Sequence, residues 1–137
     1  MKTHKKTKFM ALKQVFEILH GPKGCMWDKE QTHQSLIPYL KEEVEELIEA
    51  ITARDYLHMQ EELGDLLLQV MFHSQIAARC KKFTVEGVID GLIRKLKRRH
   101  PHVFGRVKVR SSKDIIRNWH RIKAKEPRHV RHKAFSL

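Results

Sequence analysis

The sequence predicts an all-α protein, a bundle of four to five helices that we expect dimerisation to complete. Three observations favour this class. Apolar residues recur at intervals of three and four along most of the chain, as they do on one face of a helix. Residues that cap or end helices, including Gly21-Pro22, Asp55 and Thr84, fall between these stretches. No stretch shows the strict alternation of a half-buried strand, so we expect helices alone.

The N-terminal part predicts two helices joined by a turn-rich loop. Residues 8–20 form the first helix, with apolar side chains at helical spacing at Phe9, Leu12, Phe16 and Leu19. The sequence GPKGCMWDKEQTH that follows is expected to be a loop, because glycine and proline end helices. We expect the second helix over residues 32–53, or from a few residues later, because Pro38 is tolerated only near a first turn.

The next two predicted helices differ in their apolar pattern. Residues 56–79, with Asp55 as the cap, are the most apolar stretch, and past Gly64 the helix is hydrophobic nearly all round. This composition predicts a central or interface position. Residues 85–99 are amphipathic instead, with Thr84 as the cap and a basic last turn, where the helix dipole favours cations.

A last helix is predicted near the C-terminus. HPHVFG, residues 100–105, is expected to be a loop. Ser111 or Ser112 then caps a helix from about Lys113 to Lys125. Its apolar residues are expected to face inward: Ile115, Ile116, Trp119 and Ile122.

Charge is distributed unevenly around one domain, expected over residues 8–126 with basic tails at 1–7 and 127–137. The net charge is +12. Residues 28–93 hold thirteen acidic and six basic side chains, whereas residues 94–137 hold sixteen basic and two acidic ones. This pattern suits a phosphorylated substrate that is held partly by a metal ion and partly by cationic side chains. Nucleic acid could bind the basic tails, but we do not expect it as a partner.

Several classes of protein lack support in this sequence. No apolar run approaches the roughly 18 residues that a membrane span needs. Cys25 and Cys80 are too few for a disulfide framework, and we expect a reducing, cytoplasmic setting. The sequence has no Gly-rich phosphate loop and no dinucleotide fingerprint. Its histidines do not have the spacing of a metal site.

The stretch from Leu40 to Asp65 carries the strongest chemical signal. It contains an EExxE group and an ExxD group, whose acids are Glu42, Glu43, Glu46, Glu62 and Asp65. Residues three or four apart share a face of a helix, so four of these acids can meet if the chain turns back between two helices. Packed carboxylates repel one another unless a cation lies among them. The pattern therefore indicates Mg²⁺, with Mn²⁺ as a possible substitute.

We predict Glu43, Glu46, Glu62 and Asp65 as the metal ligands. The simpler interpretation is a solvated Glu-rich helix, which accounts for most EExxE sequences. Here EELGD is followed directly by LLLQVMF, so Glu62 and Asp65 lie on a helix that is otherwise expected to be largely buried. Acids beside a buried face need partners or a metal ion.

Two weaker signals lie in the basic part of the chain. Lys95 and Arg99 are four residues apart and could hold phosphates that a metal ion does not neutralise. By themselves they indicate only a basic helix end. Trp119 and Lys123 are one turn apart and could form a ring platform beside a cation. A tryptophan at an amphipathic position is nevertheless more often part of a core.

Four segments stand in order along the chain: GCMWDKEQTHQSLIPYLKEEVEELIEAI, EELGDLLLQVMFHSQIA, KLKRRHPHVFG and NWHRIKAKE. Together they resemble the MazG family of nucleoside triphosphate pyrophosphohydrolases, over residues 10–126. The resemblance implies the all-α NTP pyrophosphohydrolase fold and a homodimer or higher assembly. It also implies Mg²⁺-dependent hydrolysis of an NTP or dNTP to a nucleoside monophosphate and pyrophosphate, by attack of water at the α-phosphorus.

The resemblance further implies a role for individual residues. The implied metal ligands are Glu43, Glu46, Glu62 and Asp65, and Glu42 is implied as the acid that orients or activates water. Lys95 and Arg99 would bind phosphate. Trp119 and Lys123 would lie beside the base. The sequence departs from the family pattern at Met26, His120 and Glu126-Pro127. These departures concern base recognition and leave the acidic quartet intact.

Two other functions stay open at this point. The first is a basic helical protein that binds nucleic acid, with the acids in a structural role; salt-sensitive binding without hydrolysis would support it. The second is a non-catalytic scaffold that retains the fold. The complete acidic quartet argues against a scaffold, because such a protein need not keep four like charges together.

Overall fold

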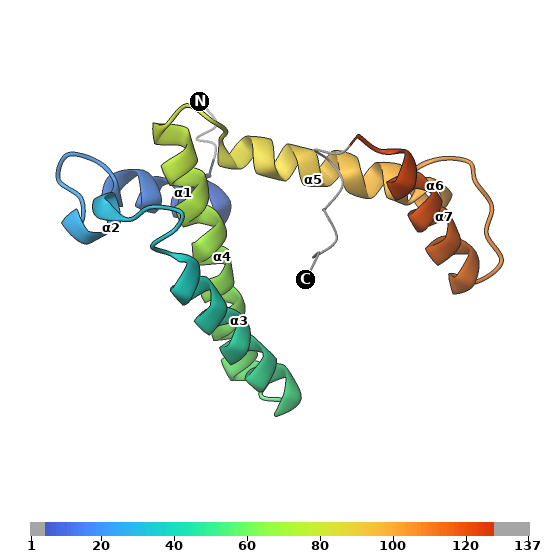
Figure 1. Cartoon of the computed structure of the whole chain (residues 1–137), viewed down its shortest axis with the longest axis horizontal. Helices are drawn as coiled ribbons and strands as arrows, with labels where there is room; N and C mark the ends of the chain where they lie inside the picture. The colour runs from blue at the N-terminus through green and yellow to red at the C-terminus, as the bar shows by residue number, and fades with distance from the viewer. Residues whose placement is uncertain (1–4, 128–137) are drawn as a thin grey trace. The chain divides into compact units, whose positions relative to one another are not determined.

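The computed structural model describes residues 5–127, which contain helices and loops but no strand (Figure 1). This part of the chain has seven helices: α1 (Lys8–Leu19), α2 (Met26–Glu30), α3 (Ile37–Thr52), α4 (Tyr56–Arg79), α5 (Val85–Arg99), α6 (Pro101–Phe104) and α7 (Ser112–Lys125). The predicted all-α class is confirmed. The chain divides into two compact units, Met1–Gly87 and Val88–Leu137, and each is described by itself. None of the described helices is both long and apolar enough to cross a bilayer.

In the first unit, α3 and α4 run side by side and are joined by a short turn (Figure 1). Arg54 adopts a left-handed conformation, with φ of 54°, where the chain reverses. Asp55 caps α4 by accepting a hydrogen bond of 3.1 Å from the backbone N–H of His58. The predicted break and cap are therefore confirmed. Because the turn is short, the EExxE group of α3 and the ExxD group of α4 are brought to facing sides of the helix pair.

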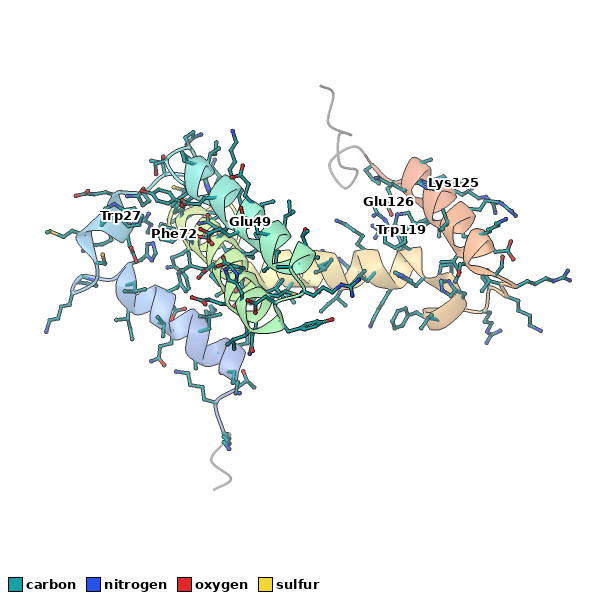
Figure 2. All side chains as sticks on the ribbon, turned by 90° about the horizontal axis from the view of Figure 1, so that it is seen from below. Trp27, Glu49, Phe72, Trp119, Lys125 and Glu126 are labelled. Carbon is teal, nitrogen blue, oxygen red and sulfur yellow. The ribbon has the colours of Figure 1, made fainter. Side chains whose placement is uncertain are left out.

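The core of the first unit is built around aromatic side chains from α1, α2 and α4. Phe16 of α1 and His20, the residue just after α1, pack edge-on against Phe72 of α4, with ring centroids 6.2 and 5.0 Å from that of Phe72. Trp27 of α2 lies 6.4 Å from Phe72 (Figure 2). Gly24 allows α2 to fold back this closely, because a Cβ at that position would collide with carbonyl groups at the end of α1. These contacts fix the C-terminal half of α4 in place.

Two expected loops contain short helices, so seven helices replace the predicted four to five. α2 forms within the expected loop GPKGCMWDKEQTH. α6 forms within HPHVFG, where Pro101 supplies the φ angle of a first helical turn. α3 begins at Ile37, later than residue 32, and has Pro38 in its first turn. The later start agrees with the alternative that Pro38 had suggested. Proline has no N–H to donate within a helix, so it is tolerated in the first turn and not further along.

The structure bears on the burial predicted for two helices. Leu67 and Leu68 of α4, past Gly64, are exposed, so α4 is not enclosed on all sides within this chain, and its predicted interface position stays a prediction. Its buried residues concentrate in the C-terminal half, because α1 packs there in addition to α3. On α7, Ile116 is 56% exposed, so the inward face of that helix is narrower than its apolar pattern predicts.

Candidate active site

Acidic side chains from α3 and α4 meet in the first unit. One carboxylate oxygen from each of Glu43, Glu62 and Asp65 lies within 4.8 Å of the other two. Glu62 is only 5% exposed, whereas Glu43 and Asp65 are half-buried. Three of the four predicted ligands are therefore brought together, and we call these three residues the acidic cluster.

The electrostatics of the acidic cluster are unfavourable without a cation. The pKa of Glu43 is raised to about 7, first by burial and then by the neighbouring charges of Asp65 and Glu46. Oε2 of Glu43 and Oε2 of Glu62 are buried and have no hydrogen-bond partner among the described residues. Unpartnered carboxylate oxygens in a confined space suit a hard divalent cation, which takes oxygen ligands. The residues present therefore fit Mg²⁺ or Mn²⁺.

Glu46, the fourth predicted ligand, lies beside the acidic cluster. Its pKa is raised, first by the close carboxyl group of Glu62 and then by the negative charge of Glu62. Glu42 adds a further like charge to Glu46 and is itself exposed. Glu46 thus faces Glu62, and Glu42 stands at the solvent side of the same helix.

His58 is a residue of this site that the sequence analysis missed. Its Nε2 lies 2.9 Å from Oε1 of Glu62 and donates a hydrogen bond to that carboxylate. The available signal was the spacing, because His58 and Glu62 are four residues apart on one helix face. This contact fixes one oxygen of Glu62 and therefore restricts the orientation of its carboxylate within the acidic cluster.

In the second unit, Arg99 and Trp119 are in contact with each other. The Arg99 guanidinium carbon lies 5.0 Å from the centre of the Trp119 ring. Arg99 is 4% exposed and donates from Nε and Nη2 to the two oxygens of Glu126, at 3.1 and 2.8 Å. Figure 2 labels Trp119 on α7 and Glu126 just past the C-terminal end of that helix. Two of the residues predicted to bind substrate are therefore brought together, but Glu126 occupies most of the Arg99 fork.

Glu126 is the second residue that the sequence analysis did not assign to a cluster. Arg98 also donates to it, at 3.0 Å, and the hydrogen bonds from Arg99 and Arg98 lower the Glu126 pKa to about 2. The sequence did contain a feature that could have indicated this role: Glu126 is one of two acids among the last forty-four residues. An isolated acid in so basic a segment is favoured as an ion-pair partner.

Lys95 and Lys123, the remaining predicted substrate residues, are half-buried. Neither forms an ion pair within 4.0 Å in the part of the chain that the structure describes. The acidic cluster belongs to the first unit and these cations to the second. Their cooperation in one triphosphate site stays a prediction.

The sequence of this chain matches a known protein family. Residues 31–104 match the MazG nucleotide pyrophosphohydrolase domain. The chain is 53% identical over 118 residues to the nucleoside triphosphate pyrophosphohydrolase/pyrophosphatase MazG of Thermotoga maritima, which covers 86% of this chain and 45% of that protein. It is 39% identical over 113 residues to the nucleoside triphosphate pyrophosphohydrolase of Escherichia coli, which covers 82% of this chain and 43% of that protein.

A solved structure gives the same result at the level of the fold. The crystal structure of a MazG-related protein from Thermotoga maritima superposes with a TM-score of 0.66 and 26% identity, over 82% of this chain and 98% of that one. This chain spans less than half the length of the curated relatives named above. The match to the solved chain, in contrast, covers nearly its whole length.

Proposed function

The chain belongs to the MazG nucleotide pyrophosphohydrolase family, and from this premise we propose that it hydrolyses nucleoside triphosphates, NTP or dNTP, to nucleoside monophosphate and pyrophosphate. Such a reaction would serve control of the nucleotide pool. The observation that carries the proposal is the acidic cluster, in which Oε2 of Glu43 and Oε2 of Glu62 are buried and have no hydrogen-bond partner among the described residues. Four neighbouring carboxyl groups without a cationic side chain are costly to retain unless an external cation binds there.

Glu43, Glu62 and Asp65, with Glu46 beside them, are proposed to hold Mg²⁺ or Mn²⁺. When bound, the cation would neutralise triphosphate charge and lower the pKa of a nearby water molecule. Glu43 must first release the proton that its pKa of about 7 lets it keep. Glu42 is proposed to orient the attacking water and accept its proton. Water then attacks the α-phosphorus, the bond to the bridging oxygen breaks, and pyrophosphate leaves.

The second unit is proposed to bind the rest of the substrate. Lys95 and Arg99 would stabilise the charge that develops on pyrophosphate, and Trp119 and Lys123 would lie beside the base. Arg99 already donates from Nε and Nη2 to Glu126, so its phosphate contact would use Nη1. Lys95 and Lys123 make no ion pair among residues 5–127 and are free to contribute charge.

We also propose that the chain functions as a homodimer or higher homo-oligomer. Apolar residues at helical spacing remain exposed on the helix pair: Val44, Ile48 and Ile51 on α3, and Leu63, Leu67 and Val70 on α4. Exposed apolar rows of this kind on two neighbouring helices favour burial against a partner surface. The proposed compartment is the cytoplasm, because Cys25 and Cys80 are both free thiols.

The direct test is a product analysis with a panel of NTPs and dNTPs and Mg²⁺. We expect chromatography to show nucleoside monophosphate and pyrophosphate in equal amounts, with Mn²⁺ supporting the reaction and EDTA stopping it. Release of nucleoside diphosphate and orthophosphate would overturn the assigned reaction.

A non-catalytic scaffold predicts a different pair of results. It would show no turnover with any nucleotide, and calorimetry would detect no Mg²⁺ binding in the presence of a non-hydrolysable NTP. The enzyme proposed here requires both turnover and metal binding. The same titration with Glu62→Gln should lose the metal signal, whereas Glu61→Gln, which changes the exposed neighbouring acid, should keep it.

A further inference from the structure

A line of positive charge runs along the exposed side of α7. It consists of four basic residues at intervals of four, which we call the basic stripe: Lys113, Arg117, Arg121 and Lys125. All four are exposed, and the Arg117 side chain is 67% exposed. Four residues of α-helix advance by about 6 Å, so the stripe presents cations at regular short intervals, which suits a polyanionic strand.

The acids of the second unit pair with only one member of the basic stripe, Arg117. Residues 88–127 contain only three acids. Asp90 pairs with Arg94, and Asp114 pairs with Arg117. Glu126 pairs with both Arg98 and Arg99. Within the described residues, Lys113, Arg121 and Lys125 therefore have no acid within 4.0 Å. Like charges four residues apart repel, so the stripe is available for an anionic partner.

A pocket of about 380 Å³ opens beside the basic stripe and shares Arg121 with it. Its lining combines apolar, cationic and amide groups: Arg98, Pro101, Val107, Asn118, Arg121 and Ile122. Apolar walls and guanidinium planes suit the faces of a nucleobase, and the Asn118 amide offers one donor and one acceptor group for a base edge. A base inside a duplex could not enter such a pocket, whereas an unstacked base of a single strand could.

We propose that this surface of the second unit binds single-stranded nucleic acid, with phosphates along the basic stripe and a base in the adjoining pocket. The sequence had pointed to nucleic acid by charge alone, through the basic tails and the excess of basic residues over 94–137. The proposed surface differs from the substrate residues Trp119 and Lys123, which are half-buried on another side of α7. The inference is independent of the proposed hydrolysis, so either can fail while the other holds.

The test is fluorescence anisotropy of a labelled 12-nucleotide single-stranded RNA with the full chain. Four phosphate contacts predict a log–log salt slope of about −3, which is a loss of affinity of roughly fiftyfold between 50 and 200 mM salt. Arg117→Glu with Arg121→Glu should weaken binding at least tenfold. The matched control, Lys81→Glu with Lys82→Glu, makes the same change in net charge at exposed positions of the first unit and should weaken binding no more than about twofold.

Further binding measurements identify which part of the nucleic acid, the phosphates or the bases, the surface recognises. An abasic strand of the same length should bind more weakly than the RNA, and Asn118→Leu should narrow that difference. A duplex of equal length should compete less well than the single strand. If the double charge reversal unfolds the chain in a CD melt, Arg117→Gln with Arg121→Gln replaces it and should still weaken binding several-fold.

Several results would overturn the proposal. The first is no binding of the single strand at 50 mM salt. The second is an equal loss of affinity in the stripe and control variants. The third is an affinity for the duplex and for the abasic strand that equals the affinity for the single-stranded RNA. Co-sedimentation with vesicles containing anionic lipid that single-stranded RNA does not compete away would assign the stripe to a membrane surface instead. A raised KM for NTP in the stripe variant, with unchanged RNA affinity, would assign it to the triphosphate.

Discussion

Glu43 in the first unit and Glu126 in the second are carboxylates with opposite surroundings. The pKa of Glu43 is raised to about 7, because it is partly desolvated and faces other acids. The pKa of Glu126 is lowered to about 2, because Arg99 and Arg98 donate to both of its oxygens. One carboxylate is satisfied by the chain itself, and the other is not.

The difference separates a structural acid from a candidate metal ligand. Within residues 5–127, the acidic cluster has His58 as its basic partner and no lysine or arginine within 4.0 Å. A chain with twenty-eight lysines and arginines does not lack cations to place there. The lack of a cationic partner at this one group of acids therefore supports the binding of a cation from outside the chain.

The largest expected effect is on catalysis at the unsatisfied acids. Asp65→Ala or Glu46→Ala should remove several kcal/mol of stabilisation of the transition state, which corresponds to about a thousandfold or more in turnover. Steady-state hydrolysis measures the loss, and the helical CD spectrum should survive in both variants. Glu61→Ala, an exposed acid on the same helix, is the matched control and should stay close to wild type. Full activity in either cluster variant would remove that residue from the ligand set.

The next effect is on stability at the satisfied acid. Glu126→Ala leaves Arg99 buried without its partner, and we expect the free energy of unfolding to fall by about 3 kcal/mol. Urea denaturation measures this change. Asp90→Ala breaks the exposed pair with Arg94 and should cost less than about 1 kcal/mol. Equal losses in the two variants would contradict a special role for the buried pair.

A smaller effect is expected at the hydrogen bond that holds Glu62. His58→Ala should raise the concentration of Mg²⁺ needed for half-maximal activity about tenfold, as loss of a group that orients a ligand typically does. His58→Gln keeps a side-chain N–H donor and should recover part of the loss. Mg²⁺ titrations of both variants measure this. Unchanged metal dependence in His58→Ala would show that the contact does not position Glu62.

The smallest effect separates the two carboxylates by pH. Glu43 has a folded pKa of about 7 against an ordinary value of 4.5, so between these values the folded state binds more protons than the unfolded state. The metal-free protein should therefore lose stability as pH rises from about 4.5 to about 7. Glu126 has a folded pKa of about 2, so its contribution is present above pH 4.5 and is lost as pH falls toward 2.

Melting temperatures in EDTA at pH 3, 5.5 and 8 test both directions. Glu43→Gln should melt a few degrees above wild type at pH 8 and equal to it near pH 4.5. Added Mg²⁺ should raise the wild-type melting temperature more at pH 8 than at pH 5.5, because metal binding needs the ionised carboxylate. A Glu43→Gln protein that is less stable than wild type at pH 8 without metal would contradict the raised pKa.

Local sequence patterns are sufficient to identify the longer helices and the residue types of the acidic cluster. Helical periodicity and caps such as Asp55 act locally, so they identified α1, α4, α5 and α7 without tertiary information. The spacing of the two acidic groups also predicted that Glu43, Glu62 and Asp65 would meet, and they do. Short α2 and α6 were missed, because single turns have little periodicity and depend on packing and on proline position.

Tertiary structure decided which charges are satisfied. Glu42, Glu43 and Glu126 are the same residue type in different surroundings. Glu42 is exposed, Glu43 lies among other acids, and Glu126 accepts hydrogen bonds from two arginines. Burial and partner distance fix these states, and both depend on residues distant along the chain. The same reason explains Arg99, which the sequence presents as a free cation and the fold pairs with Glu126, twenty-seven residues away. Local pattern gives the groups, and packing sets their solvation and therefore their chemistry.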